Sequence, residues 1–450
     1  MTFEEAKNKL EQHGQAHVLR FWDTLDGAAQ AALLAQIETL DFDSIARMQK
    51  MLLGETEPTP CAEPLAPEVI EGLPATKRAE AREAGEELLR AGKVAVLLVA
   101  GGQGSRLGYE GPKGAYPIGP VSGRSLFYFH ARKIVGMSSR YGKPIPFYIM
   151  TSATNDAATK AHFEAHDYFG LNREDVMFFQ QGEWPALDEQ GNIILDAQGH
   201  IFMSPDGHGG TLSALDKSGR LADMEKRGIT SVFYFQVDNP LVDIADPVFI
   251  GLHATHGADV SLKVCAKRTP DEGMGVPAIR NGSNAIVEYT ELTKEQAHRQ
   301  TADGELYFKF GSVAIHVFSV AFLRQRVSGN LPLHVAHKRI PMCDADGNAV
   351  PPDRKNGYKF EKYIFDVLPH AQKVVNLAFD RADEFSPVKN QNTEPNDTPA
   401  TCQRDLQAKW RRWLAQHGVQ VRDDIPLEID PAYLFTPGDL KDGLRIGYTS

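Results

Sequence analysis

The beginning of the chain carries apolar residues at the spacing of amphipathic helices. The i, i+3, i+4, i+7 pattern appears in Val18, Phe21, Trp22 and Leu25. A similar pattern resumes over residues 33–37. This spacing gathers the apolar side chains on one face of a helix, where they can pack against a core. We therefore predict a small helical unit over roughly the first 50 residues.

From Lys77 onward, helical stretches alternate with short apolar runs. A helix is predicted through residues 87–89. The β-rich apolar runs are residues 94–100, 147–150 and 231–237. Runs of this length, separated by helices, are typical of buried strands in a mostly parallel sheet that has helices on both faces.

Two turn signals interrupt this alternation. Asn281-Gly282 and Asp303-Gly304 mark hairpin-like turns, which predict an antiparallel element inserted around residues 265–320. The predicted fold class is therefore α/β, with a mixed, mostly parallel, Rossmann-like central sheet flanked by helices. Small N- and C-terminal units complete it.

Two stretches unsuited to regular structure divide the chain. Residues 54–74 contain several prolines, too many for a helix, and should form an extended segment. The polar residues 391–400 precede a helix in which Leu406, Trp410 and Trp413 share one face, as core contacts do. The expected parts are 1–90, a helical region with the Pro-rich linker; 91–390, the large central domain; and 391–450, a small C-terminal domain.

The composition is that of an ordinary globular protein. With 450 residues, 42% of them hydrophobic, the chain can bury a sizeable core without disulfides or structural metals. Its 48 basic and 59 acidic residues give a formal net charge of -11, the opposite of the basic footprint of nucleic-acid binding. We expect no nucleic-acid partner. If the ligand is a nucleotide triphosphate, the cations that hold it must be concentrated in its binding site and not spread over the surface.

The cysteines and the start of the chain bear on its compartment. Cys61, Cys265, Cys343 and Cys402 are scattered and form no CxxC pair, so neither a zinc site nor a disulfide framework is predicted. The first residues lack a basic-then-apolar leader, and no uninterrupted apolar run approaches the ~18 residues of a membrane span. We expect a cytoplasmic protein without membrane contact, either a monomer or a weak homo-oligomer.

One apolar run leads directly into a glycine-rich turn. Without Cβ atoms, Gly101, Gly102 and Gly104 let backbone N–H groups converge on an anion. Arg106 and Lys113 can add charge-assisted contacts to the same phosphates. The sequence therefore predicts a phosphate-binding loop, because a purely structural turn would leave this Arg and Lys unexplained.

Two commoner phosphate-binding loops do not fit these residues. A dinucleotide fingerprint that started at Gly102 would need Gly or Ala at Leu107. A P-loop needs Gly-Lys-Ser/Thr, whereas Lys113 lies between Pro112 and Gly114. NAD or FAD binding and a Walker-type ATPase are both disfavoured.

An acidic residue follows the apolar run 231–237. Asp238 stands before Asn239-Pro240, and such a sequence alone is more often a turn. In open α/β sheets, however, ligands bind beyond the carboxyl ends of the strands, so Asp238 could share a crevice with the glycine-rich loop. A carboxylate there suits Mg²⁺ bound to a triphosphate.

The sequence resembles the UDP-sugar pyrophosphorylases, particularly the eukaryotic-type UDP-N-acetylglucosamine pyrophosphorylases. The resemblance covers most of the chain, and many matches in the same order make chance agreement improbable. The matching motifs are residues 14–22, 97–114, 178–182, 205–210, 237–239, 287–289, 356–361 and 384–390.

The resemblance implies a glycosyltransferase-A-like nucleotidyltransferase fold and assigns roles to individual residues. The UTP phosphates would be held by Gly101, Gly102, Gly104, Arg106, Lys113 and Lys389, of which Arg106, Lys113 and Lys389 would be catalytic. The nucleoside would contact Gln181, Gly207 and His208, and the magnesium Asp238. The sugar pocket would include Gly275, Glu288 and the Gly311-Ser312 turn.

Without the resemblance, Gln181 and Lys389 would be interpreted as surface residues, Glu288 as a solvated carboxylate and Gly275 as a loop glycine.

Two positions depart from the family pattern. Members specialised for N-acetylglucosamine usually have Asn where this chain has His208 and Ser312. Ser312 is shorter than Asn and reaches different hydroxyls, and sugar choice depends on such placed hydrogen bonds. N-acetylglucosamine, N-acetylgalactosamine, glucose and galactose therefore all stay open, and His208 could also be a plain polar loop residue.

The predicted reaction joins UTP and a sugar 1-phosphate, N-acetylglucosamine 1-phosphate being favoured, to give a UDP-sugar and pyrophosphate. Mg²⁺ would assist a direct in-line attack on the α-phosphate, and no activated nucleophile is needed because the attacking oxygen is already anionic. The alternatives are a UTP-glucose-1-phosphate uridylyltransferase, a broad UDP-sugar pyrophosphorylase, a GTP- or CTP-dependent nucleotidyltransferase, which Gln181 would discriminate, and a binding protein without turnover.

Overall fold

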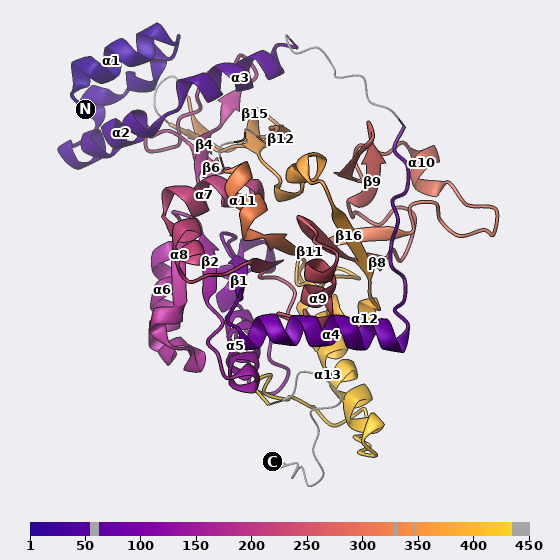
Figure 1. The fold of residues 1–450 in the computed structure, drawn as a ribbon. Helices are drawn as coiled ribbons and strands as arrows, with labels where there is room; N and C mark the ends of the chain where they lie inside the picture. Colours follow the sequence, from indigo (N-terminus) through magenta and orange to yellow (C-terminus); the bar gives the residue numbers. More distant parts are fainter. Residues whose placement is uncertain (55–62, 328, 330, 345–347, 434–450) are drawn as a thin grey trace. The chain divides into compact units, whose positions relative to one another are not determined.

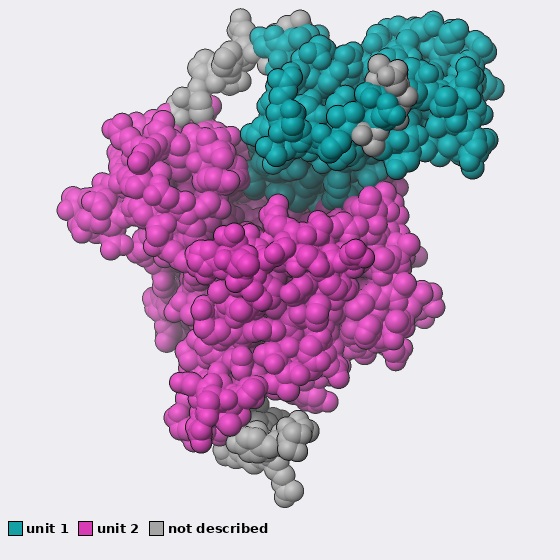
Figure 2. Space-filling view, turned by 180° about the vertical axis from the view of Figure 1, so that it is seen from behind, with its two compact units in different colours: residues 1–61, 181–211, 330–366 teal, residues 62–180, 212–329, 367–450 magenta. Residues whose placement is uncertain are grey.

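The computed structural model describes residues 1–54, 63–327, 329, 331–344 and 348–433, so that Cys61 and the first part of the Pro-rich stretch lie outside the described residues. The chain forms two compact units, coloured separately in Figure 2. Unit 1 consists of residues 1–61, 181–211 and 330–366, and unit 2 of residues 62–180, 212–329 and 367–450. The three-part division expected from the sequence stays a prediction.

A seven-stranded sheet forms the centre of unit 2, with the strand order β16-β8-β11-β7-β1-β2-β3. The strands are β1 (Val94–Val99), β2 (Phe147–Thr151), β3 (Val176–Gln180), β7 (Ser231–Gln236), β8 (Val260–Ala266), β11 (Phe310–Ser319) and β16 (Val374–Ala378). β11 pairs antiparallel with β7 and β8, whereas the other neighbours pair in parallel. The predicted mixed, mostly parallel sheet is confirmed.

The sheet is covered on both faces. Successive side chains of a strand point to opposite faces, yet Val96, Leu97 and Leu98 are all buried. The main helices of unit 2 are α4 (Ala75–Arg90), α5 (Leu126–Tyr141), α6 (Asp156–Ala165), α9 (Pro247–Thr255) and α13 (Pro399–Gln416), as Figure 1 shows. Among the described helices, none is both long and apolar enough to cross a membrane.

Helices α4 and α9 lie side by side and approach closely (Figure 1). Two glycines permit this contact. A Cβ on Gly85 would lie 1.9 Å from the Pro247 carbonyl oxygen, and one on Gly251 would lie 1.7 Å from the Ala81 carbonyl oxygen. The backbones can therefore meet only because both positions lack a side chain.

Helix α13 packs into the core of the central sheet. Leu406, Trp410 and Trp413 are buried in the cluster that also holds the inner residues of β1. The Trp410 ring stacks on Phe129 of α5 with ring centroids 6.3 Å apart. The tryptophans are core contacts, as predicted, and the core that they enter is that of the sheet.

The predicted antiparallel insertion is present. Strands β9 (Val276–Arg280) and β10 (Ser283–Val287) pair through the Asn281-Gly282 turn, where both residues have positive φ. The described part of the Pro-rich stretch is extended, and it forms isolated bridges from Leu65 to Ile279 and from Ile70 to Leu377. Both expectations are confirmed for the described residues.

Unit 1 combines N-terminal helices with short strands from the middle of the sequence. Its helices are α1 (Phe3–Gln12), α2 (Gly27–Thr39) and α3 (Phe42–Leu52). Its strands include β4 (Glu183–Pro185), β5 (Leu187–Asp188), β6 (Met203–Pro205), β12 (His334–Lys338) and β15 (Gly357–Glu361). Their apolar side chains share one core cluster.

The helix predicted from the spacing of residues 18–25 is wrong. The chain forms two separate 3₁₀ turns there, at Ala16–Leu19 and Trp22–Thr24. Just before this segment, the buried amide of Gln15 donates to the Gly191 carbonyl oxygen and accepts from Ile193 N–H. These long-range bonds fix the start of the segment independently of its apolar periodicity.

The close contact between α4 and α9 predicts a stability effect. Replacing Gly251 with Ala should force the helices apart and lower the free energy of unfolding by about 1–3 kcal/mol. Chemical denaturation of the wild type and the variant measures this difference. Gly72→Ala is the control, because nothing lies within 4 Å of its added Cβ. Equal effects of the two substitutions would contradict the steric explanation.

Candidate functional site

The glycine-rich segment after β1 folds back on itself. Gly104 donates its N–H to the Gly111 carbonyl oxygen at 2.9 Å, and Lys113 donates its N–H to Gly102 at 3.0 Å. A Cβ on Gly104 would lie 2.7 Å from the Tyr109 ring, whereas a Cβ on Gly102 would meet nothing within 4 Å. The Gly104 N–H was predicted from the sequence to face an anion. It instead bonds to Gly111 and shapes the loop.

Two buried side chains hold the start of this loop. Asn155 donates to the carbonyl oxygens of Ala100, at 2.8 Å, and Gly102, at 3.2 Å, and Ser152 donates its hydroxyl to Gly101 at 2.8 Å. In a trans peptide the C=O and N–H point in opposite directions. Holding the carbonyls of Ala100 and Gly101 thus turns the N–H groups of Gly101 and Gly102 away from Asn155 and Ser152. Neither side chain was predicted from the sequence.

Lys113 and Asp238 lie together at the carboxyl ends of β1 and β7. The Lys113 ammonium lies 3.4 Å from the Asp238 carboxylate, and their side chains are 17% and 13% exposed. Burial opposes ionisation of Asp238, but the charges of Lys113 and Lys389 outweigh it and hold the pKa of its carboxyl below the ordinary value. The carboxylate is therefore ionised at neutral pH and has two cations beside it.

The backbone around Asp238 is anchored on two sides. Burial lowers the pKa of His130 to about 3, so its ring is neutral. Its Nε2 lies 2.9 Å from the Val237 carbonyl oxygen, a contact in which Nε2–H donates because the carbonyl can only accept. Val388 donates its N–H to the Asp238 carbonyl oxygen at 2.8 Å, and this bond brings the neighbouring Lys389 to the site.

Arg106 lies on the same loop, in the 3₁₀ turn Ser105–Leu107, and its side chain is exposed. Lys389 is half-buried. The structure thus brings Lys113, Lys389 and Asp238 together. Among the described contacts of this site, no side-chain hydrogen bond or ion pair holds Arg106. Its expected role in phosphate binding stays a prediction.

The residues expected at the sugar also form a cluster in unit 2. Ser312 donates its N–H to the Gly275 carbonyl oxygen at 2.8 Å. A Cβ on Gly275 would lie 2.9 Å from the Glu288 carboxylate, so Gly275 leaves room for that side chain. The expected Gly311-Ser312 turn is wrong, because both residues lie in β11, immediately before a register shift between Ser312 and Ile315.

The residues expected at the nucleoside lie in unit 1. Gln181 is buried, at 9% exposure. The alternative interpretation, that it is a surface residue, is therefore wrong. Gly207 has φ +83°, and a Cβ there would lie 2.6 Å from the Lys362 carbonyl oxygen. His208 stacks on Tyr363, with ring centroids 5.2 Å apart, and its Nδ1 accepts from Ile364 N–H at 3.1 Å.

The electrostatics of His208 fix its tautomer. Burial, and then the nearby His334, lower the pKa of His208 to about 4. The ring is therefore neutral at neutral pH. Because Nδ1 accepts from Ile364 N–H, the proton is on Nε2, which can donate a hydrogen bond.

Comparisons with known proteins bear on the family of the chain. Residues 61–397 match the family described as UTP--glucose-1-phosphate uridylyltransferase. UDP-N-acetylhexosamine pyrophosphorylase-like protein 1 of Xenopus tropicalis is 38% identical over an alignment of 441 residues, and the match covers 94% of this chain and 86% of that protein. UDP-N-acetylglucosamine pyrophosphorylase of Saccharomyces cerevisiae is 35% identical over an alignment of 447 residues, and the match covers 94% of each chain.

A solved structure extends the likeness to the fold. The crystal structure of the uridine diphosphate N-acetylglucosamine pyrophosphorylase from Trypanosoma brucei, in complex with inhibitor, matches with a TM-score of 0.83 at 30% identity. The match covers 97% of this chain and 93% of that one. Fold and relatives together define a nucleotidyltransferase. The chain belongs to the UTP–glucose-1-phosphate uridylyltransferase family, and the resemblance to the UDP-sugar pyrophosphorylases is confirmed.

The lowered pKa of His208 predicts a pH-dependent contribution to stability. Its folded value of about 4 lies below the ordinary value of about 6.5. The folded state therefore resists protonation, and stability present above pH ~6.5 is lost as the pH falls toward 4. Between pH 7 and pH 5 this group should account for a loss of about 1–2 kcal/mol.

The His208→Asn variant tests this prediction by chemical denaturation at both pH values. Asn keeps an oxygen that can accept from Ile364 N–H but has no proton to gain in this range. The variant should therefore lose less stability than the wild type when the pH is lowered. An identical pH dependence in the two proteins would contradict the assignment of a depressed pKa to His208.

Proposed function

We propose that this uridylyltransferase joins UTP to a sugar 1-phosphate, with N-acetylglucosamine 1-phosphate favoured, and releases pyrophosphate. The observation that carries the proposal is the cluster of Lys113, Lys389 and the ionised Asp238 at the ends of β1 and β7. The relatives named as UDP-N-acetylglucosamine and UDP-N-acetylhexosamine pyrophosphorylases support this choice of substrate.

The reaction requires charge neutralisation more than proton transfer. An anionic oxygen of the sugar phosphate attacks the α-phosphorus of UTP, and the bond from that phosphorus to the bridging oxygen of the β-phosphate breaks. Pyrophosphate leaves with the electron pair. Lys113, Lys389 and Arg106 would reduce the repulsion between the two phosphates and stabilise the charge that develops on pyrophosphate. No general base is needed.

Asp238 would hold a magnesium ion. Mg²⁺ is usually bound through one or two carboxylates together with substrate phosphates and water, and a single ionised carboxylate beside a phosphate-binding loop fits this pattern. The ion would neutralise charge on the triphosphate. Lys113, which contacts Asp238 at 3.4 Å, would then turn from the carboxylate to a phosphate oxygen.

Gln181, Gly207 and His208 would recognise the nucleoside. Gly207 would shape the loop that holds the base, because its missing side chain lets it pack against residues 361–362. The amide of Gln181 can both donate and accept hydrogen bonds. The Nε2–H of His208 would supply a donor where the family usually has Asn. This assignment favours UTP over GTP or CTP.

Gly275, Glu288 and Ser312 would contact the sugar. Glu288 can accept hydrogen bonds from sugar hydroxyls, and Ser312 reaches less far than the Asn usual in the family. A broader UDP-sugar pyrophosphorylase, or a UTP-glucose-1-phosphate uridylyltransferase, is the second candidate. Ser312 and the family description both favour it.

We further propose that the protein works in the cytoplasm as a monomer or weak homo-oligomer, without a membrane or nucleic-acid partner. The net charge of -11 supports the absence of nucleic acid. The described cysteines, Cys265, Cys343 and Cys402, are buried free thiols, as expected in a reducing compartment.

A panel of sugar 1-phosphates tests the reaction. With UTP and Mg²⁺, pyrophosphate release should be fastest, as kcat/KM, with N-acetylglucosamine 1-phosphate. N-acetylgalactosamine, glucose and galactose 1-phosphates complete the panel, and GTP and CTP replace UTP as controls. Release with glucose 1-phosphate above all others would favour the second candidate. Silence with every sugar, while UTP still binds, would favour a binding protein without turnover.

Replacing Lys113 with Ala should slow turnover by roughly 10²–10³-fold, by analogy with the loss of a preorganised donor to a developing charge. Steady-state pyrophosphate release measures this effect. Lys77→Ala is the control, since it removes a lysine that pairs with Glu80 on the exposed face of α4 and should leave turnover unchanged. Unchanged turnover in the Lys113 variant would remove this residue from the mechanism.

A further inference from the structure

Two segments that are far apart in the sequence meet at Asp238. The first, residues 237–246, follows β7. The second, residues 384–389, follows α12 (Arg381–Glu384) and ends at Lys389. Asp238 and Lys389 belong to different segments, which must be held in register for both side chains to act on the same triphosphate. The bond from Val388 N–H to the Asp238 carbonyl oxygen is one link between them.

Asn239 joins these segments with both ends of its amide. Its Nδ2 donates to the Glu384 carbonyl oxygen at 2.7 Å, and its Oδ1 accepts from Ser386 N–H at 3.1 Å. The side chain is 3% exposed, so water cannot replace these partners. Asn239 adjoins Asp238 in the chain, and Ser386 lies three residues before Lys389.

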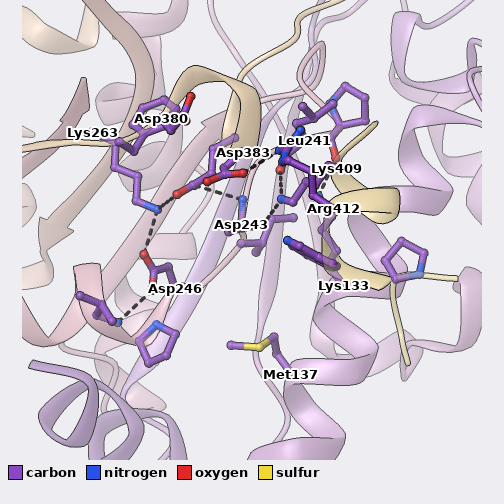
Figure 3. A pocket seen from close by; sticks show the side chains of 18 of the residues that line it. Lys133, Met137, Leu241, Asp243, Asp246, Lys263, Asp380, Asp383, Lys409 and Arg412 are labelled. Atoms are coloured by element: carbon purple, nitrogen blue, oxygen red, sulfur yellow. Dashed lines mark hydrogen bonds and ion pairs between the residues drawn. The ribbon is translucent and has the colours of Figure 1, made fainter. Parts of the chain in front are cut away.

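The same two segments are also tied by ion pairs farther from Asp238. Lys263 joins both segments, because it lies 2.9 Å from Asp246 and also contacts the Glu384 carboxylate. Lys409 of α13 lies 2.6 Å from Asp243 and holds the first segment. Figure 3 shows Lys263 directed toward Asp246, and Lys409 near Asp243, at a cavity of about 380 Å³. These contacts hold residues 243–246, whereas Asn239 acts at the residue next to the carboxylate.

An amide suits this position for a chemical reason. The Glu384 carbonyl oxygen needs a donor, and the Ser386 N–H needs an acceptor. Asp at position 239 would offer oxygens alone and would face the carbonyl with a negative charge. A methyl group could satisfy neither partner, and a hydroxyl would have to donate and accept through one oxygen atom, whereas the amide has two separate atoms for the two partners.

We propose that Asn239 is a positioning residue for uridylyl transfer. By joining Asp238 to the segment of Lys389, it fixes the spacing between the carboxylate that holds the metal and the second phosphate-binding lysine. The inference rests on the proposed function. Asn239 contributes to the reaction by placing Lys389. Once Lys389 has been removed, replacing Asn239 should therefore change pyrophosphate release little.

A double-mutant cycle of Asn239→Ala and Lys389→Ala tests this coupling. The readouts are kcat and KM for pyrophosphate release and, separately, the affinity for UTP with Mg²⁺ measured by calorimetry. Asn239→Ala alone should lower kcat/KM on the order of 10–100-fold, as expected for misplaced groups. In the Lys389→Ala background the same substitution should cost less than about 3-fold.

Asn376→Ala serves as the matched control. Asn376 of β16 is also a buried asparagine that donates to a backbone carbonyl, that of Glu68, at 3.0 Å. The Asn376→Ala substitution should lower thermal stability. Any change that it causes in UTP affinity should be the same with and without Lys389. Asn239→Asp, of nearly equal size, is the second variant if Asn239→Ala does not fold, and it should show the same coupling to Lys389.

The outcomes separate the two hypotheses. Equal effects of the Asn239 substitution in the presence and absence of Lys389 would overturn the positioning role, because a general loss of stability acts independently of that lysine. If the wild type releases no pyrophosphate with any sugar of the panel, the proposed function fails instead. The cycle of UTP affinities then still decides whether Asn239 acts through Lys389.

Discussion

The pairing of β1 with β7 is the constraint on which the site depends. The strands are parallel neighbours, and Val99 lies opposite Gln236 in the register. Gly101 and Asp238 each follow two residues later, so both segments leave the sheet at the same level. This geometry lets one cationic side chain, Lys113, reach the carboxylate that follows the other strand. A shift of one residue in this register would displace the two segments relative to each other by about 3.3 Å.

Buried amides convert this strand geometry into a fixed arrangement of backbone groups. Asn155 holds the carbonyls of the glycine loop, and Asn239 joins the Asp238 segment to that of Lys389. The lysines themselves are less buried and have long side chains. A rigid backbone with adaptable cations suits phosphoryl-group chemistry, because the charges must follow the phosphate oxygens as one bond forms and another breaks.

The sequence predicted those features whose signal is local. Strands β1, β2 and β7 are buried on both faces and therefore read as uninterrupted apolar runs, and Asn281-Gly282 marks its own turn. The site contacts of Asn239 were not predictable, since its partners Glu384 and Ser386 lie about 145 residues away. Periodicity failed at residues 18–25, which form two separate 3₁₀ turns. They follow Gln15, whose amide is anchored by tertiary bonds that periodicity does not report. The relatives confirm the family, whereas the roles carried over to single residues stay predictions.

Phosphate chemistry and the proposed sugar contacts arise from different parts of unit 2. Lys113 and Asp238 follow strands β1 and β7, whereas Gly275 and Glu288 flank the β9–β10 hairpin and Ser312 lies in β11. If the sugar binds there as proposed, a substitution in the hairpin or in β11 would alter its hydrogen bonds without moving the lysine and the carboxylate. Ser312 is such a departure from the family pattern. Its backbone bond to Gly275 depends on no particular side chain, so this position can vary while the strand stays in place.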